Sequence, residues 1–269
     1  MILIGKRKSL VDVHTHSEFS KDSNVTLKDY VDKAQTIGLK GICFTEHVDQ
    51  NPEEKYYDFY SHNEFNKSLN ILQESLTASK ADLLLLKGIE YSEPNLYPEE
   101  FRKLTAEDFD MVMAAVHWVN GGFLGSNSII DNNSKSKIFS LYYKRLLNMV
   151  KFGDFDVLAH FDFPRRYLGK ETKKDFHEEK YNILQEIIKQ DIVIELNTSS
   201  IRKAGLELMP ARDILLMYKN LGGEKVVLGS DAHLISDLAA DIGLAKAISD
   251  EMGLISGYFK ERKFVEYKY

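Results

Sequence analysis

The sequence predicts a parallel α/β barrel, and two features of its pattern support that prediction. Short apolar runs alternate with segments of helical periodicity along nearly the whole chain of 269 residues. Seven of these runs stop on polar side chains, at 11–16, 41–47, 83–90, 111–117, 157–160, 192–197 and 226–233. Six of the eight histidines fall at those ends. Because a barrel gathers the carboxyl ends of its strands at one mouth, we expect these side chains to meet there.

The apolar runs are the expected strands, and helices are expected between them. Consecutive apolar residues are typical of strands that are covered on both faces. Thr26 and Asp29 resemble a capping box at the start of the first helix, and Gly38 provides its stop. The expected helices are 27–37, 61–79, 135–152, 176–190, 211–221 and 238–252, and Gly153, Gly222 and Gly253 follow three of them. Such alternation requires a parallel sheet.

The connections expected at the mouth of the barrel are long. They cover 50–60, 92–104, 121–133 and 163–175, where a barrel carries its active-site rim. No Pro-rich or Ser-rich linker divides the chain, so residues 1–269 are expected to form a single domain. The tail 258–269 alternates aromatic and charged residues, which suits an edge strand or an interface.

Composition excludes several classes of function. The net charge of −6 argues against nucleic acid as a partner, because phosphate-backbone binding needs a positive surface. No run reaches the roughly 18 apolar residues of a membrane span, and the N-terminus lacks the order of a secretory signal. Cys43 is the only cysteine and lies in an apolar run, as a packing residue would. We expect a cytoplasmic protein; its oligomeric state is left open.

Two pairs of residues have the spacing of metal ligands on a strand. His14 and His16 are two residues apart, so their side chains point to one face and can hold one ion together. Hydrogen-bonded polar histidines at a strand end are the alternative. Asp231 and His233 repeat this spacing after the last core strand. Asp231 could instead cap a helix, but Ser236 lies closer to the expected helix start.

Single candidates follow the other strands. One histidine in such a place is more often a satisfied core residue than a ligand, but several at successive strand ends favour a shared site. Glu90 ends a leucine-rich strand, where an unpaired carboxylate would be costly to bury. The sequence around Asp22 is equally compatible with a turn residue and with a metal ligand. The candidate metal ligands are His14, His16, Asp22, His47, Glu90, His117, His160, Asp231 and His233. They exceed the needs of one tetrahedral ion and indicate two or three divalent ions.

Clustered metal ions favour in-line displacement at phosphorus. Arginines in the rim loops are suited to bind the oxygens of the phosphate group. Arg202 follows the one strand without a terminal histidine, and Arg165 and Arg166 follow His160. Solvated surface arginines are the alternative for each, and Arg202 ranks first as a phosphate ligand. Ser17, directly after His16, is a further candidate for substrate binding.

From Asp12 to about Ser236, these motifs resemble in order those of the histidinol-phosphate phosphatases in the PHP (polymerase and histidinol phosphatase) superfamily. The resemblance implies a distorted seven-stranded (β/α)7 TIM-like barrel with a trinuclear metal centre. It assigns His14, His16, Glu90 and Asp231 to one ion, Asp22, His47 and His233 to a second, and Glu90, His117 and His160 to a third. The family is associated with zinc. Asp22 stands where some members have histidine, which favours manganese or iron.

The resemblance also implies an activity, the metal-dependent hydrolysis of L-histidinol phosphate to L-histidinol and phosphate in histidine biosynthesis. In the mechanism we expect, a hydroxide that bridges two ions attacks phosphorus in line. Arg202 neutralises the non-bridging oxygens, and His233 or Asp162 protonates the leaving alkoxide.

Three other functions stay open. The same centre could act on a phosphotyrosyl protein or on a nucleotide phosphodiester. An amidohydrolase also begins with His-x-His, but that family expects eight strands and a lysine ligand near mid-barrel. A non-catalytic metal-binding module is the third, and its test is a phosphatase assay under metal titration.

Overall fold

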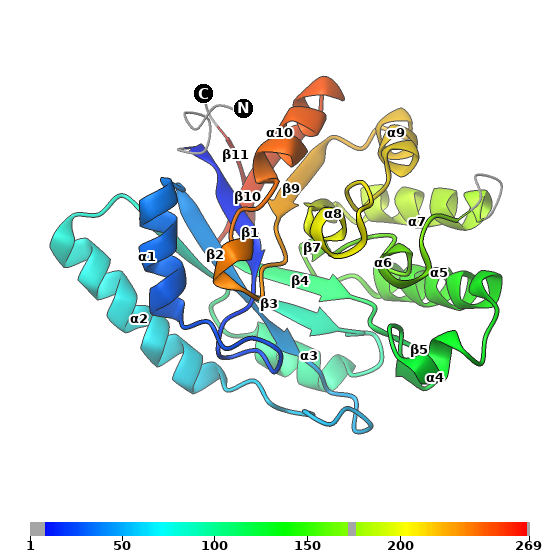
Figure 1. The fold of residues 1–269 in the computed structure, drawn as a ribbon, viewed down its shortest axis with the longest axis horizontal. Helices are drawn as coiled ribbons and strands as arrows, with labels where there is room; N and C mark the ends of the chain where they lie inside the picture. Colours follow the sequence, from blue (N-terminus) through cyan, green and yellow to red (C-terminus); the bar gives the residue numbers. More distant parts are fainter. Residues whose placement is uncertain (1–8, 172–175, 268–269) are drawn as a thin grey trace.

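The computed structural model describes residues 9–171 and 176–267, and Figure 1 shows a sheet with helices packed around it. The strands are β1 (Val11–Thr15), β2 (Gly41–Val48), β3 (Leu84–Ser92), β4 (Met111–Ala115), β5 (Trp118–Val119), β6 (Gly122–Phe123), β7 (Val157–Leu158), β8 (Val193–Asn197), β9 (Lys225–Gly229), β10 (Ile255–Lys260) and β11 (Lys263–Glu266). The helices are α1 (Leu27–Ile37), α2 (His62–Ser79), α3 (Pro98–Thr105), α4 (Asn127–Ile130), α5 (Lys135–Phe152), α6 (Arg165–Leu168), α7 (His177–Lys189), α8 (Ser199–Ala204), α9 (Arg212–Asn220) and α10 (Ile242–Glu251), with a 3₁₀ turn η2 (Ile235–Asp237).

The main sheet has nine strands in the order β1-β2-β3-β4-β7-β8-β9-β10-β11. Neighbouring strands pair in parallel from β1 to β10, and β11 pairs with β10 in the antiparallel sense. β5 and β6 form a separate two-stranded ribbon. The prediction of a mixed α/β fold with a parallel sheet is confirmed.

The strand order is open, although the end of β1 reaches the chain beyond β9. Thr15 and Ala232 form an isolated parallel bridge, and the His16 amide donates to the Ala232 carbonyl at 2.9 Å. The first residues of β9 pair instead with β10, where Lys225 faces Ile255. Because β10 occupies that edge of β9, β1 meets the following segment only past the end of the strand.

The start and the end of α1 follow from local chemistry. The Thr26 hydroxyl accepts a hydrogen bond from the Asp29 amide at 3.0 Å and donates to the Asp29 carboxylate at 2.7 Å. Gly38 ends the helix with a φ of 71°, a left-handed conformation that glycine adopts without a steric penalty. The predicted N-cap at Thr26 is confirmed, although the Asp29 carboxylate bonds the Thr26 hydroxyl, where a full capping box has it bond the Thr26 amide.

Four segments differ from the prediction, the first two at 92–104 and 238–252. The expected loop 92–104 contains most of α3, which begins at Pro98 and carries Glu99 and Glu100 in its first turn. Proline at the first helical position and early carboxylates are both helix-start signals, so this helix was readable from the sequence. The expected helix 238–252 begins only at Ile242, because Asp241 before it has a φ of 57°.

The other two differing segments are expected loops that contain short helices or a strand, and the C-terminal tail is a strand. The expected loop 121–133 contains β6 and α4, and the loop 163–175 contains α6, with residues 172–175 outside the described part. The tail forms β11 and part of β10 at the edge of the sheet, as one of the two readings predicted; residues 268–269 are not described.

The core lies between the sheet and its helices. Every residue of β1, β4 and β8 is buried, as continuous apolar strands covered on both faces should be. Within the described ranges, no helix combines the length and the hydropathy that crossing a bilayer requires. The buried strands fix the positions of their ends, and these ends position the candidate functional side chains.

Candidate metal centre

The polar side chains predicted at the strand ends come together at the carboxyl edge of the sheet. His14 belongs to β1, His47 to β2 and Glu90 to β3. His117 and His160 follow β4 and β7 by two residues each, and Asp231 and His233 follow β9. Side chains from six strands of the sheet, β1, β2, β3, β4, β7 and β9, thus converge because the strands are parallel.

The first group contains His14, His16 and Asp231, all buried, with candidate ligand atoms within 4.8 Å of one another. Oε2 of Glu90 lies 3.4 Å from Nε2 of His14 and 3.6 Å from Nε2 of His16. Oδ1 of Asp231 lies 3.8 Å from Nε2 of His16. These spacings leave room for an ion between the groups rather than for direct hydrogen bonds.

The second group contains Glu90, His117 and His160. Oε1 of Glu90 lies 2.8 Å from Nε2 of His160 and 3.4 Å from Nε2 of His117. The two carboxylate oxygens of Glu90 therefore face different groups, Oε2 toward the first and Oε1 toward the second. That geometry is what a carboxylate bridging two sites requires.

The third group contains His16, His47 and His233. The imidazole of His16 stacks with both of the others, with ring centroids 4.1 Å from His47 and 4.2 Å from His233, and the centroids of His47 and His233 are 5.6 Å apart. Oδ2 of Asp22 lies 3.5 Å from Nε2 of His47 and 3.2 Å from Nε2 of His233. The loop after β1 thus brings Asp22 to the same edge.

This donor set fits divalent cations. Nε2 of His14 and Nε2 of His16 are buried and have no hydrogen-bond partner among the described residues. A buried polar atom without a partner costs about 1–3 kcal/mol, so such atoms usually meet a ligand, a water or an ion. Imidazole nitrogens beside carboxylates are ligands that transition-metal ions prefer.

The electrostatics agree with a cation-binding role. Burial would by itself raise the pKa of Glu90, but the imidazoles of His14, His117 and His47 hold it well below its usual range. For His16, burial and then the neighbouring His47 and His233 lower the pKa well below its ordinary value. Burial alone would lower the pKa of His14 and of His47, but the carboxylates beside them, Glu195 and Glu90 for His14 and Asp22 and Glu90 for His47, hold it well above the ordinary value. A bound cation would replace the protons on these two rings, since imidazoles bind metal in the neutral form.

A second layer of polar groups fixes the orientation of the imidazoles. Nδ1 of His14 lies 2.7 Å from Oε1 of Glu195, whose other oxygen accepts from the His160 amide at 2.9 Å. Nδ1 of His16 lies 3.2 Å from the Ser20 hydroxyl, and Nδ1 of His117 lies 2.8 Å from the Ser92 hydroxyl. Holding one ring nitrogen this way directs the other toward the ion.

Sequence reasoning missed Glu195, although a signal for it existed. It is fully buried inside β8, where a charged residue in an all-buried strand needs a partner. A Cβ at Gly229 would lie 2.0 Å from Oε1 of Glu195 and 2.6 Å from Cβ of His14. Glycine at that position in β9 therefore makes space for the contact between Glu195 and His14.

A cavity of about 270 Å³ opens at this edge of the sheet, and basic side chains lie on its wall. Arg166 is among them, and its guanidinium donates to Ser199 and to the Asp231 carboxylate. Lys21 and Lys203 also line the cavity, and the sequence did not single them out. Lys21 precedes Asp22 and Lys203 follows Arg202, and the sequence predicted both Asp22 and Arg202 as site residues.

Other predicted substrate residues lie outside the lining of this cavity. The guanidinium of Arg202 donates to the Ser230 carbonyl at 2.6 Å, and Arg165 donates to Asp162 at 2.6 Å. Asp162 is buried and also accepts from the Ala211 amide at 3.1 Å. Ser17 is buried and donates to Glu46 at 2.6 Å. Substrate binding by Arg202, Arg165 and Ser17, and catalysis by Asp162 and Arg202, stay predictions from the sequence, and the placement favours Arg166.

Residues 12–199 match the PHP domain family, a range that contains seven of the nine predicted ligands. The chain is 27% identical over 259 residues to a probable histidinol-phosphatase of Clostridium acetobutylicum, covering 93% of this chain and 97% of that protein. It is 29% identical to the histidinol-phosphatase of Lactococcus lactis, covering 83% of this chain and 84% of the relative.

Among solved structures, the fold is similar to that of histidinol phosphate phosphatase from Lactococcus lactis, which was crystallised with zinc, L-histidinol and phosphate. The TM-score is 0.83 at 23% identity, and the superposition covers 96% of this chain and 99% of that one. Fold and sequence thus agree, and the chain belongs to the PHP domain family.

Proposed function

We propose that this protein is a metal-dependent phosphomonoesterase that hydrolyses L-histidinol phosphate to L-histidinol and phosphate, as a step of histidine biosynthesis. The observation that carries the proposal is the convergence of six imidazoles and three carboxylates beside a cavity lined by Arg166, Lys21 and Lys203. The names of the Clostridium and Lactococcus relatives support the choice of substrate. A cytoplasmic location stays a prediction.

We propose that the three ligand groups hold two or three divalent ions, zinc, manganese or iron, with Glu90 as the shared ligand. When bound, such ions would lower the pKa of water and neutralise charge on the phosphoryl oxygens. The long spacings between the ligand atoms and the unpaired ring nitrogens support this assignment.

The side chains around the ligand groups would bind the phosphate. Arg166 offers a planar guanidinium that suits phosphate oxygens, and Lys21 and Lys203 add positive charge at the cavity wall. For protonation of the leaving alkoxide, His233 lines the cavity while Asp162 is engaged by Arg165. His233 would take this role in a two-ion arrangement that leaves its ring uncoordinated. Histidinol would then leave through the open side of the cavity.

We also propose a single PHP domain in which β1, β2, β3, β4, β7, β8 and β9 form the distorted seven-stranded barrel. The bridge from Thr15 to Ala232 supports closure between the first and last of these strands. The position of β10 on the first residues of β9 would distort such a barrel, since β10 occupies the edge that β1 would otherwise pair with.

The test combines metal analysis of the purified protein with kinetics on three substrates, namely L-histidinol phosphate, p-nitrophenyl phosphate and a phosphotyrosyl peptide. We expect bound divalent metal and a kcat/KM for L-histidinol phosphate at least about 100-fold above the other two. A preference for the phosphotyrosyl peptide would replace the substrate proposed here. Absence of hydrolysis of all three by metal-loaded protein would remove the phosphatase proposal.

A further inference from the structure

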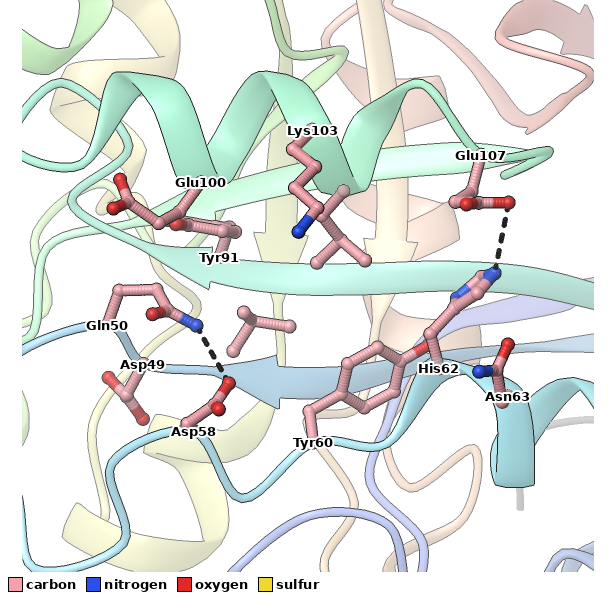
Figure 2. A pocket seen from close by; sticks show the side chains of 12 residues that line it. Asp49, Gln50, Asp58, Tyr60, His62, Asn63, Tyr91, Glu100, Lys103 and Glu107 are labelled. Atoms are coloured by element: carbon pink, nitrogen blue, oxygen red, sulfur yellow. Dashed lines mark hydrogen bonds and ion pairs between the residues drawn. The ribbon is translucent and has the colours of Figure 1, made fainter.

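A second cavity, of about 400 Å³, lies on the opposite face of β2 and β3 from the metal centre. Successive residues of a strand point to opposite faces. His47 and Glu90 face the first cavity, whereas their neighbours Val48 and Tyr91 line the second. In Figure 2, α3 forms one wall of the second cavity and the chain before α2 forms the facing wall.

The charge around this second cavity is negative. Four carboxylates line it, those of Asp49, Asp58, Glu100 and Glu107, against one lysine, Lys103. Asp58, Glu100 and Glu107 are exposed, whereas Asp49 is buried. Such a lining attracts a cation and repels an anion, so a phosphate ester does not suit it.

Two buried polar atoms at the wall of the second cavity have no hydrogen-bond partner. Oη of Tyr91 and Oδ1 of Asp49 make no hydrogen bond within the described part of the chain. The other oxygen of Asp49 accepts from Lys21 at 2.5 Å, so one acceptor position on this carboxylate stays free. A donor group placed in the cavity would satisfy both atoms.

The rest of the lining is apolar or aromatic. Val48 and Leu104 offer aliphatic surface, and Tyr60 offers a ring that Figure 2 shows between the strands and the start of α2. A cation with an apolar body would gain both burial and a contact with an aromatic face. The volume lies within the range of small-molecule sites.

A metal ion fits this region poorly. His62, Glu107 and Asp108 lie close enough to one another to hold one. However, Nε2 of His62 already lies 2.9 Å from Asn66 and its Nδ1 lies 3.2 Å from the Tyr60 hydroxyl. Nζ of Lys87 pairs with Asp108 at 2.6 Å. Asp49 and Tyr91, which carry the unpartnered atoms, line the cavity instead, where there is space for a larger ligand.

We propose that this second cavity is a binding site for a small organic ammonium ion with an aromatic or aliphatic body. The ammonium group donates to Oδ1 of Asp49 and to Oη of Tyr91. The carboxylates of Asp58 and Glu100 at the mouth draw it in, and its body packs on Val48, Tyr60 and Leu104.

Isothermal titration calorimetry of the metal-loaded protein with phenethylamine tests the proposal. We expect saturable binding with one site per chain. The neutral 2-phenylethanol and the anionic 3-phenylpropionate should bind at least about 10-fold more weakly, because the lining is acidic. Saturating inorganic phosphate should not displace the amine, since phosphate belongs in the first cavity. Absence of saturable binding, equal binding of the neutral alcohol, or displacement by phosphate would overturn the proposal.

Variants locate the site. The double variant Asp58→Asn/Glu100→Gln should weaken phenethylamine about 3- to 10-fold, as the loss of two exposed charges does. Glu99→Gln is the matched control, because it removes a charge from the same helix turn at an exposed residue that does not line the cavity. Equal weakening by the control would refer the binding to general surface charge and overturn the assignment.

Lys21 connects the second cavity to the first, because it lines the catalytic cavity and pairs with Asp49. A bound ammonium would share Asp49 with Lys21, so we expect saturating phenethylamine to change KM about 2- to 5-fold for L-histidinol phosphate while kcat stays within twofold. This effect rests on the proposed function, whereas the calorimetry needs no turnover. An unchanged KM in protein that binds the amine would overturn the connection.

Discussion

Glu90 lies where the three ligand groups meet. Its Oε2 faces His14, His16 and His47, and its Oε1 faces His117 and His160, all within 3.6 Å. It is buried, and these imidazoles favour its ionised form. No other described side chain contacts the nitrogens of five ligand histidines in this way. The negative charge of Glu90 therefore favours cation binding by all three ligand groups.

We expect Glu90→Gln to lower both metal content and activity. The amide keeps the shape of the carboxylate but removes its charge and one of its acceptors. Bound metal per chain, measured by plasma mass spectrometry, should fall by at least one ion, and kcat/KM should fall at least about 100-fold. Glu99→Gln serves as the control at an exposed position. Full metal content in Glu90→Gln would contradict a bridging role.

Glu195 acts one layer further out, through His14. We expect Glu195→Gln to weaken metal affinity about 10- to 100-fold, because the amide no longer favours the His14 tautomer whose Nε2 faces the ion. Competition with a chelator of known affinity measures this directly. Glu186→Gln, at a residue paired with Lys189 on the surface of α7, is the control. Unchanged affinity in Glu195→Gln would show that the contact is structural.

The two ends of the strands do different work. The candidate metal ligands and the basic side chains near them lie at the carboxyl ends of the strands. At the amino ends, charged side chains instead form contacts that link neighbouring elements. The Asp156 carboxylate accepts from the Val112 amide at 2.8 Å and pairs with Arg262 in the β10–β11 hairpin. Asp110 accepts from the amides of Lys87 at 2.9 Å and Glu261 at 3.0 Å. These contacts join β3, β4, β7 and the hairpin far from the metal centre.

Asp156 gives a prediction for pH. Burial raises its pKa above the ordinary 3.8, and the opposing pull of Arg262 does not cancel this effect. The folded state then holds this proton more tightly than the unfolded state. Stability from Asp156 is present below the unfolded pKa and is lost as pH rises through the folded one.

In Asp156→Asn the side chain is neutral at every pH. The free energy of unfolding of the variant minus that of the wild type should therefore rise as pH increases from about 3 across the titration range of Asp156, then level off. Urea unfolding at a series of pH values measures it. Asp154→Asn, at an exposed carboxylate, is the control. A difference that falls with pH would reverse the sign and refute the argument.

The candidate metal ligands come from strands spread across the sheet, from β1 to the segment after β9 (Figure 1). An ion cluster at this place would connect elements separated by more than 200 residues, including the gap where Thr15 and Ala232 form a bridge. It would also satisfy ring nitrogens that are otherwise buried without partners. Binding should therefore stabilise the molecule as a whole.

Removal of metal should lower the thermal stability. Ligands present at about 100 times their dissociation constant contribute about 2.7 kcal/mol. For a chain of this size we expect Tm to fall by about 5–10 °C after chelation and to recover when zinc or manganese returns. Differential scanning calorimetry measures the shift. Loss of activity with an unchanged Tm would mean that the cluster makes no contribution to the fold.

Residue pattern alone determined the alternation of strands and helices, the first helix with its caps, and the candidate ligand set, because strand ends and the residue types that bind metals are both local properties. His14 with His16, and Asp231 with His233, are close in the chain and share a face wherever the strand goes. The tertiary structure decided where long side chains reach. Arg166 rather than Arg202 lines the cavity beside the candidate metal centre, and Glu195 meets His14, because these contacts depend on loop direction and on neighbouring strands. For the same reason the second cavity could not be predicted from the sequence, since its walls come from four segments, 48–50, 58–63, 91 and 100–107, that only folding brings together.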